Sequence, residues 1–201
     1  MGADPRTDAA EPSTLLRSAR RLDWRFLLPD HRIGRVAYVG RPDPDLRDAL
    51  ERIAEAVEEV DGASAAEGPY DFVVCREPAP DELAASAALV GPGGCLYAEI
   101  ERSFMDRLRD ARHPGRTQLH ALRRLSAEPF WHWPDFENCE EIVPLADPGA
   151  IRLMLARRRA YGARAKVAAA RALLALRLVG PAASCISVVA TAEGSLEGPS
   201  G

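Results

Sequence analysis

Three short apolar segments, separated by stretches with helical periodicity, constrain the fold of this chain more than any other feature. They are RVAYVG (35–40), YDFVVC (70–75) and CLYAEIE (95–101), and each is apolar enough to be buried on both faces of a sheet. Strands of this kind that alternate with helices are joined by right-handed βαβ crossovers. The sequence therefore predicts an α/β fold with a doubly wound, mostly parallel sheet.

The segment after the first apolar run has the signals of a helix start. Asp43 is a suitable N-cap, and Pro44 stands at the first helical position, where a missing N–H costs nothing. One apolar helical face comes next, made of Leu46, Leu50, Ile53 and Val57. We expect this helix to end between 57 and 61, so VEEVDG (57–62) is either its last turn or a short strand. A second helix, with Asp81 as its cap, is expected to stop at Gly-Pro-Gly-Gly (91–94).

The second half of the chain continues the pattern with a helix near 115–125 and a strand in EPFWHWP (128–134). Strand alternation would place Trp131 and Trp133 on one side and Phe130 and His132 on the other. The later segments are CEEIVPL (139–145), a long basic helix (148–179) and a last strand, CISVVATA (185–192). Eight Lys or Arg and no acid lie between 148 and 192, although the whole chain has a net charge of −4.

The length of 201 residues favours one α/β domain, which we place at 13–192 with an N-terminal helix and lead-in at 13–34. The polar ends 1–12 and 193–201 are expected to be flexible. Four widely separated cysteines, without a CxxC pair, suggest neither a metal site nor a disulfide framework, which is typical of a cytoplasmic protein. No run reaches the ~18 apolar residues of a membrane span. Basic residues are not interleaved with aromatic ones, which argues against nucleic-acid binding.

The order of segments from 35 to 101 resembles the core of class I S-adenosylmethionine-dependent methyltransferases, and the Pro-Gly-Gly turn at 92–94 is the best match. The resemblance implies S-adenosylmethionine as cofactor, with the methionine end against Gly40 and the ribose hydroxyls on an acidic residue that ends the second strand. Asp61 is the candidate for that residue, with a solvated turn aspartate as the alternative. Cys75 would form a wall of the pocket, with a buried strand residue as the alternative. Because 61–68 is too short for a complete βαβ connection, we expect a seven-strand-type sheet that lacks one strand or helix.

The turn after Gly40 departs from that family. The family places small residues where the cofactor lies against the backbone, whereas this chain has Arg41, Pro42, Asp43 and Pro44. The two prolines remove two N–H donors from a loop whose amides usually help to bind the ligand. The sequence therefore leaves open whether the cofactor binds, and whether the protein is an enzyme.

The residues support two hypotheses, from different classes of protein. The first is a methyltransferase acting on a small glycan or natural-product intermediate of a bacterial biosynthetic pathway, which is the class suggested by a soft resemblance of 130–145 to bacterial enzymes of such pathways. His132 would then be the general base, with a structural histidine as the alternative. Arg41 and Arg76 would contact an anionic substrate, or a different nucleotide or sugar phosphate held in the same pocket.

The second hypothesis is a catalytically inactive methyltransferase-like module that binds a partner protein or serves as an accessory subunit. The basic helix 148–179 and exposed tryptophans would form the contact. Weak peripheral membrane contact through the same helix is a further expectation, weak because its apolar stripe is mostly alanine. The altered turn after Gly40 favours this second hypothesis.

Overall fold

The computed structural model of the chain describes residues 19–28, 33–60, 69–109, 116–157, 168, 172, 175 and 183–192. Both predicted flexible tails lie outside these residues. So do most of the predicted N-terminal helix and all of the basic helix after residue 157, apart from three single positions. Within the described ranges, no helix has both the length and the apolar character needed to cross a bilayer.

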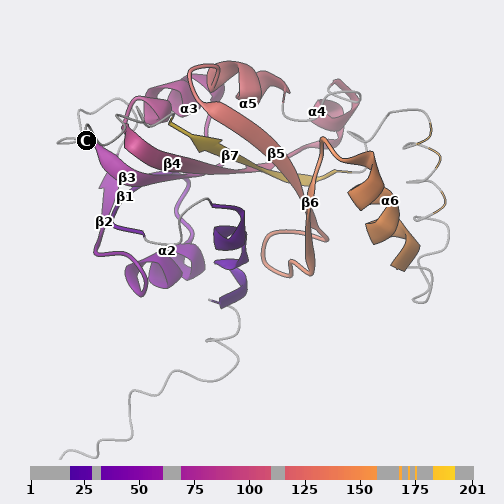
Figure 1. Cartoon of the computed structure of the whole chain (residues 1–201), viewed down its shortest axis with the longest axis horizontal. Helices are drawn as coiled ribbons and strands as arrows, with labels where there is room; N and C mark the ends of the chain where they lie inside the picture. Colours follow the sequence, from indigo (N-terminus) through magenta and orange to yellow (C-terminus); the bar gives the residue numbers. More distant parts are fainter. Residues whose placement is uncertain are drawn as a thin grey trace, which may run out of the picture.

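Seven strands form one sheet in the order β2-β1-β3-β4-β7-β5-β6 (Figure 1). Their bounds are Arg35–Gly40 (β1), Ala56–Val60 (β2), Tyr70–Arg76 (β3), Val90–Glu101 (β4), Ser126–Trp133 (β5), Glu141–Pro144 (β6) and Cys185–Thr191 (β7). The first four strands are mutually parallel, β7 is antiparallel to both β4 and β5, and β6 is antiparallel to β5. Strand β5 therefore runs in the same direction as the first four, and the predicted α/β class with a mostly parallel sheet is confirmed.

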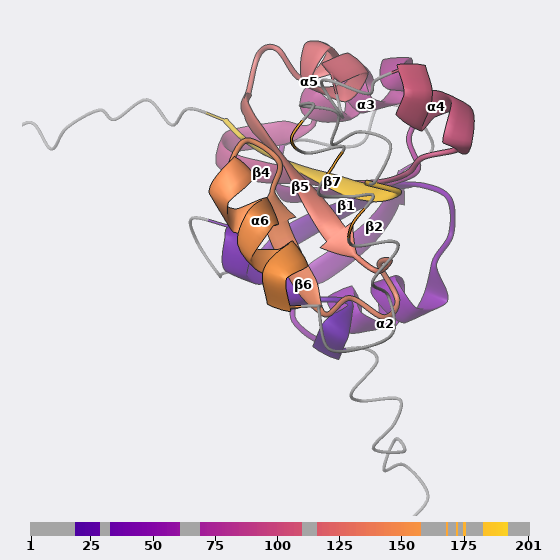
Figure 2. The same ribbon diagram turned by 90° about the vertical axis from the view of Figure 1, so that its right-hand side faces the viewer.

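Helical segments cover both faces of this sheet. They are η1 (Asp23–Leu27), α2 (Pro44–Glu51), α3 (Pro80–Ala87), α4 (Phe104–Arg109), α5 (Arg116–Ala121) and α6 (Pro148–Arg157). Figures 1 and 2 show η1 and α2 against one face, and α3, α4 and α5 over the other. Two hydrophobic clusters match these layers, one around Leu83, Leu96 and Leu122, and the other around Trp24 and Leu46. Side-chain alternation along each strand supplies both clusters.

Several local predictions hold. Asp43 caps α2 by accepting a 3.0 Å hydrogen bond from the backbone N–H of Leu46, and Pro44 is the first helical residue. In β5, Trp131 packs in the cluster on the α3 side and Phe130 in the cluster on the α2 side, as the alternation predicts. Of the two alternatives for 57–62, the strand is correct for 57–60, while 61–62 lie outside the described residues.

Other local predictions are wrong, mostly at the ends of elements. Helix α2 ends at Glu51, so Ile53 lies in a turn and Val57 in β2. The helical spacing of apolar residues extends past the end of the helix only because β2 also places apolar side chains toward the core. The N-cap of α3 is Ala79 and not Asp81, since Pro80 begins the helix and Glu82 accepts from the Ala79 N–H at 3.2 Å. Strand β4 begins at Val90 and so includes the Gly-Pro-Gly-Gly segment, with a register shift against Tyr70 and Phe72.

Candidate functional site

The carboxyl ends of β1, β3 and β4 lie side by side, where a doubly wound sheet usually presents its ligand site. Gly40 of β1 is paired with Arg76 of β3, and Arg76 is paired with Glu99 of β4. The start of α2, with Asp43, follows β1 at the same edge. The geometry of these residues decides whether this edge is open to a ligand.

Gly40 is required by a close approach between two strands. Its φ is +94°, a conformation that side chains rarely adopt, and a Cβ at this position would stand 2.4 Å from the carbonyl oxygen of Arg76. The same carbonyl accepts a 2.9 Å hydrogen bond from the N–H of Arg41. The backbone of this turn therefore packs against β3, and this contact alone accounts for a glycine at position 40, without a bound molecule.

The turn between Gly40 and α2 has few free donors. Pro42 and Pro44 have no N–H, and the amides of Arg41 and Leu46 donate to Arg76 O and to the Asp43 carboxylate. Arg47 N–H donates to the Asp43 carbonyl at 2.9 Å. The amides that usually hold an anionic or polar ligand at a helix N-terminus are here used for capping and strand contact.

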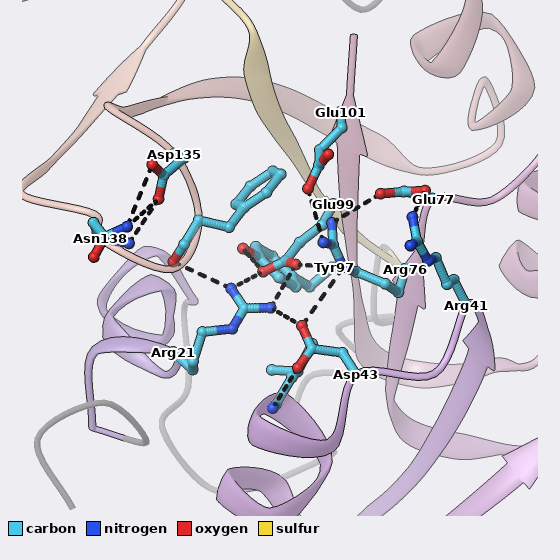
Figure 3. A network of polar contacts seen from close by, with 12 residues as sticks. Arg21, Arg41, Asp43, Arg76, Glu77, Tyr97, Glu99, Glu101, Asp135 and Asn138 are labelled. Atoms are coloured by element: carbon cyan, nitrogen blue, oxygen red, sulfur yellow. Dashed lines mark hydrogen bonds and ion pairs between the residues drawn. The ribbon is translucent and has the colours of Figure 1, made fainter. Parts of the chain in front are cut away.

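Arg21, from the segment that precedes η1, lies across this edge (Figure 3). Its two terminal nitrogens donate to both oxygens of Glu99 at 2.9 and 2.8 Å, and one of them also donates to Asp43 Oδ2 at 2.7 Å. The Phe136 carbonyl accepts a further bond at 3.3 Å. Arg21 is 3% exposed and Glu99 is 0% exposed. Burial opposes the charge of Arg21, but Glu99 and Asp43 outweigh it and raise the pKa of Arg21 above its ordinary value.

Arg76 extends the same network toward solvent. Its Nε lies 3.6 Å from Asp43 Oδ2 and 3.5 Å from Glu99 Oε2, and one terminal nitrogen donates to Glu101 at 2.8 Å. The guanidinium group lies 5.4 Å from the centre of the Phe136 ring. Four side chains, Arg21, Asp43, Arg76 and Glu99, thus form a connected group, here called the edge network, that covers the strand ends.

An aromatic stack supports the edge network from below. The Tyr97 hydroxyl donates to Glu99 Oε1 at 3.0 Å, and the Tyr97 ring stacks on Trp24 with centroids 4.2 Å apart. Trp24 also stacks on Phe72 at 5.2 Å. The N-terminal segment that carries Arg21 is therefore anchored to the sheet by a buried tryptophan three residues later.

These contacts test the fit of S-adenosylmethionine at this edge. Such a cofactor needs unoccupied amides after β1, space above the strand ends and a free carboxylate, whereas the polar groups present bond to one another. Three hollows among the described residues, of about 660, 610 and 300 Å³, are lined by none of Gly40, Arg41, Asp43 and Arg76. The residues present do not fit the cofactor in this conformation.

The other two predicted cofactor contacts are Asp61 and Cys75. Asp61 lies outside the described residues. Cys75 is fully buried and packs in the cluster on the α3 side, so it does not line the edge network. Alternation along β3 is the reason, since Arg76 points to the α2 side and its neighbour must point the other way. Burial raises the pKa of the Cys75 thiol to about 12.

His132 is an interior side chain and not an available general base. It is 2% exposed, its Nε2 lies 2.8 Å from Ser187 Oγ, and its Nδ1 lies 3.6 Å from Cys139 Sγ. Burial lowers the pKa of His132 to about 3, so it is neutral at physiological pH. This burial supports the structural alternative for His132. A general base has to come within hydrogen-bond distance of the substrate, and the His132 ring is buried beside Ser187 and Cys139.

The predicted anion contacts differ from each other. Arg41 is largely exposed and pairs with Glu77 at 3.1 Å, while Arg76 is held in the edge network. Neither guanidinium group is without an acidic partner. Sequence reasoning missed Arg21 altogether, because its partner Glu99 lies 78 residues away and no local spacing connects them.

The exposed tryptophans expected for a partner contact are also absent among the described residues. Trp24 is 2% exposed and Trp131 is 1% exposed, and Trp133 is only partly exposed beside it. Each of the first two fills space between the sheet and a covering segment. Of the basic helix predicted as part of this surface, only the first ten residues, as α6, and three single later positions can be described.

No protein-family model and no curated protein matches this chain. Solved structures do. A Thermotoga maritima methyltransferase, described as a possible histamine N-methyltransferase, is 9% identical with a TM-score of 0.44, over 90% of this chain and 89% of that one. The N-methyltransferase NodS of Bradyrhizobium japonicum is 10% identical with a TM-score of 0.43, over 92% and 98%. A putative Haloferax volcanii methyltransferase, solved with the Trm112 activator, is 11% identical with a TM-score of 0.45, over 92% and 99%.

All three are described as methyltransferases, the Haloferax volcanii protein as a putative one. At these identities and TM-scores the similarity says nothing of what this chain binds. The ligand and the activity have to be argued from the residues at the strand ends.

Proposed function

We propose that this protein is a catalytically inactive methyltransferase-like module that acts by binding a partner protein. The observation that carries the proposal is the paired hydrogen bonding of Arg21 to Glu99 at the edge where a cofactor would enter. A ligand at this edge would have to displace Arg21, which would leave the buried Glu99 carboxylate with only the more distant Arg76 guanidinium and the Tyr97 hydroxyl as partners.

The energy of that displacement is large compared with the affinity of a cofactor. Removing one partner of a buried ion pair typically costs about 3–5 kcal/mol. A ligand that binds at about 1 μM gains about 8 kcal/mol in total. Displacing Arg21 would therefore use roughly half of the binding free energy of such a ligand, and the two prolines after Gly40 remove further donors. Both effects favour a strand-end edge that is covered by Arg21 over one that holds a cofactor.

The exposed surface of α6 supports the second part of the proposal. Arg152, Leu153 and Arg157 are exposed, while Ile151, Met154 and Leu155 are buried beneath them. No acidic partner of Arg152 or Arg157 is found among the described residues. Two arginines beside a leucine are suited to a protein surface that combines carboxylates with an apolar side chain.

Calorimetry with S-adenosylmethionine and S-adenosylhomocysteine tests the proposal, with thermal melting as a second readout. We expect no heat and no shift of the melting temperature at millimolar ligand. A ligand present at 100 times its Kd would add about 2.7 kcal/mol to the free energy of unfolding, so binding would be plain in the melting curve. Saturable binding that is abolished by Gly40→Val would overturn the proposal in favour of the methyltransferase hypothesis.

Partner binding is tested by comparing full-length protein with the Arg152→Glu/Arg157→Glu variant in affinity capture from the source cells. A partner that is identified and shown to bind in purified form should bind the variant at least tenfold more weakly. Arg52→Glu, directly after α2, is the matched control, because it alters an exposed arginine outside α6. Equal binding of all three proteins would remove α6 from the proposal.

A further inference from the structure

The largest of the three hollows lies at the opposite edge of the sheet, among the amino ends of the strands. It has a volume of about 660 Å³, within the usual range of small-molecule sites. Its lining comes from residues just before β2 and β1 and from the first residues of β3 and β4, and these strands are adjacent in the sheet. None of the edge network lines it, so a ligand in this hollow would be independent of the proposed function.

This hollow is here called the amino-end pocket, and part of its lining is apolar. Its apolar lining residues are Leu28, Ile33, Ile53, Phe72, Pro92 and Cys95. Phe72 is held in place by its stack on Trp24, and Leu28, Ile33 and Cys95 belong to the same buried cluster. These four side chains are nearly fully buried, so the apolar surface open to a ligand comes mainly from Ile53 and Pro92.

The polar side chains of the amino-end pocket are both carboxylates. Asp71 accepts from the Arg35 N–H through Oδ2 at 2.8 Å, and its Oδ1 has no hydrogen bond among the described residues. Glu55 lies on the other side of Gly34, to whose carbonyl its N–H donates at 3.1 Å, and its side chain has no partner in the described part of the chain. No described lining residue has a cationic side chain.

Glycines keep the wall between these carboxylates and β4 open. A Cβ on Gly34 would stand 2.2 Å from Asp71 Oδ2, so the carboxylate lies where a side chain would otherwise be. Gly93 has φ +74°, with nothing within 4 Å of the position of a Cβ. The wall thus offers carboxylate and backbone oxygen atoms beside the apolar part of the lining.

From this arrangement we propose that the amino-end pocket binds a small organic ammonium compound, with its apolar part against Ile53 and Pro92 and its ammonium group between Glu55 and Asp71. An ammonium group has only donors, and the side-chain groups on the wall have only acceptors. Both carboxylates are exposed, so water also solvates them, but their two negative charges favour a cationic ligand over an anionic one.

Isothermal calorimetry with 2-phenylethylamine tests the proposal, with 3-phenylpropanoate as a probe of similar shape and opposite charge. We expect saturable 1:1 binding of the amine and none of the carboxylate. Glu55→Gln/Asp71→Asn should weaken amine binding at least tenfold, and the fold is retained because the amide oxygen introduced at position 71 can still accept from the Arg35 N–H. Asp45→Asn/Asp48→Asn on α2 is the matched control and should bind as the original protein does.

Three results would overturn the proposal: no amine binding at millimolar concentration, equal binding of amine and carboxylate, or equal amine affinity in the Glu55/Asp71 variant. S-adenosylmethionine also carries an ammonium group, so any heat from it should be measured again in this variant. If the heat of S-adenosylmethionine binding is lost in the variant, the ligand binds in the amino-end pocket. If the heat persists, the ligand binds elsewhere, which would contradict the proposal that the edge network leaves no room for the cofactor.

Discussion

The guanidinium group of Arg21 binds both carboxylate oxygens of Glu99, at 2.9 and 2.8 Å, across a separation of 78 residues. This pair joins the N-terminal segment to the end of β4, and it does so where related folds present a ligand. Because both side chains are almost fully buried, neither can change without consequence for the other.

Arg21→Met should destabilise the protein by about 3–5 kcal/mol, because it removes from the buried Glu99 carboxylate the guanidinium group that binds both its oxygens and leaves only the more distant Arg76 as a cation. The double variant Arg21→Met/Glu99→Leu should recover much of that loss, since apolar side chains can replace a buried pair at little cost. Urea denaturation followed by circular dichroism measures both. Arg47→Met, which breaks the exposed pair with Glu51, is the control and should change little. A single variant as stable as the original would contradict the buried pair.

Gly40→Ala should cost more stability than Gly93→Ala. Both glycines have positive φ, so each substitution carries conformational strain of about 1–3 kcal/mol. Only at residue 40 would the new Cβ also meet backbone, at 2.4 Å from Arg76 O, whereas at 93 it enters open space. The difference between the two free energies of unfolding isolates the approach of β1 to β3. Equal losses would mean that this approach is looser than described.

The stability of the protein should fall as the pH drops from 6.5 toward 3, and His132 should account for part of that fall. Burial lowers the pKa of His132 from 6.5 to about 3, so the unfolded chain takes up a proton in this window and the folded one does not. One such proton corresponds to about 1.4 kcal/mol per pH unit. His132→Gln should show a shallower dependence between pH 6 and 4, measured by urea denaturation at each pH. An unchanged slope would contradict the buried neutral ring.

The four cysteines should react slowly with Ellman's reagent in the folded protein and fully in urea. All four are buried free thiols, and burial raises the pKa of Cys139 to about 11 and that of Cys75 to about 12. Reaction therefore requires both exposure and deprotonation, which unfolding supplies. Rapid labelling of any thiol at pH 8 without denaturant would show that its cover opens readily.

The sequence by itself determined the alternation of strands and helices in the first half of the sheet. Buried runs such as 35–40 and 70–75 were predicted correctly because a strand covered on both faces is a nearly continuous apolar segment, so its two ends are easy to recognise in the sequence. The Asp43 cap was also predictable, since capping depends on residues within one turn of each other. Element ends were less so: the apolar spacing of Ile53 and Val57 fits a helix and a following strand equally well.

Only the tertiary structure decided whether the carboxyl ends of the strands are open to a ligand or covered by the edge network. The sequence identified the altered turn after Gly40 and left two functions open. It offered a structural role for His132 and burial of Cys75 as alternatives to a role at the site, and local patterns did not predict the role of Arg21. Partners 78 residues apart are brought together only by the sheet order, and whether a polar side chain faces a cleft or the interior depends on which segment covers it. Periodicity reports the near neighbours of a residue, whereas burial and ion pairing depend on distant ones.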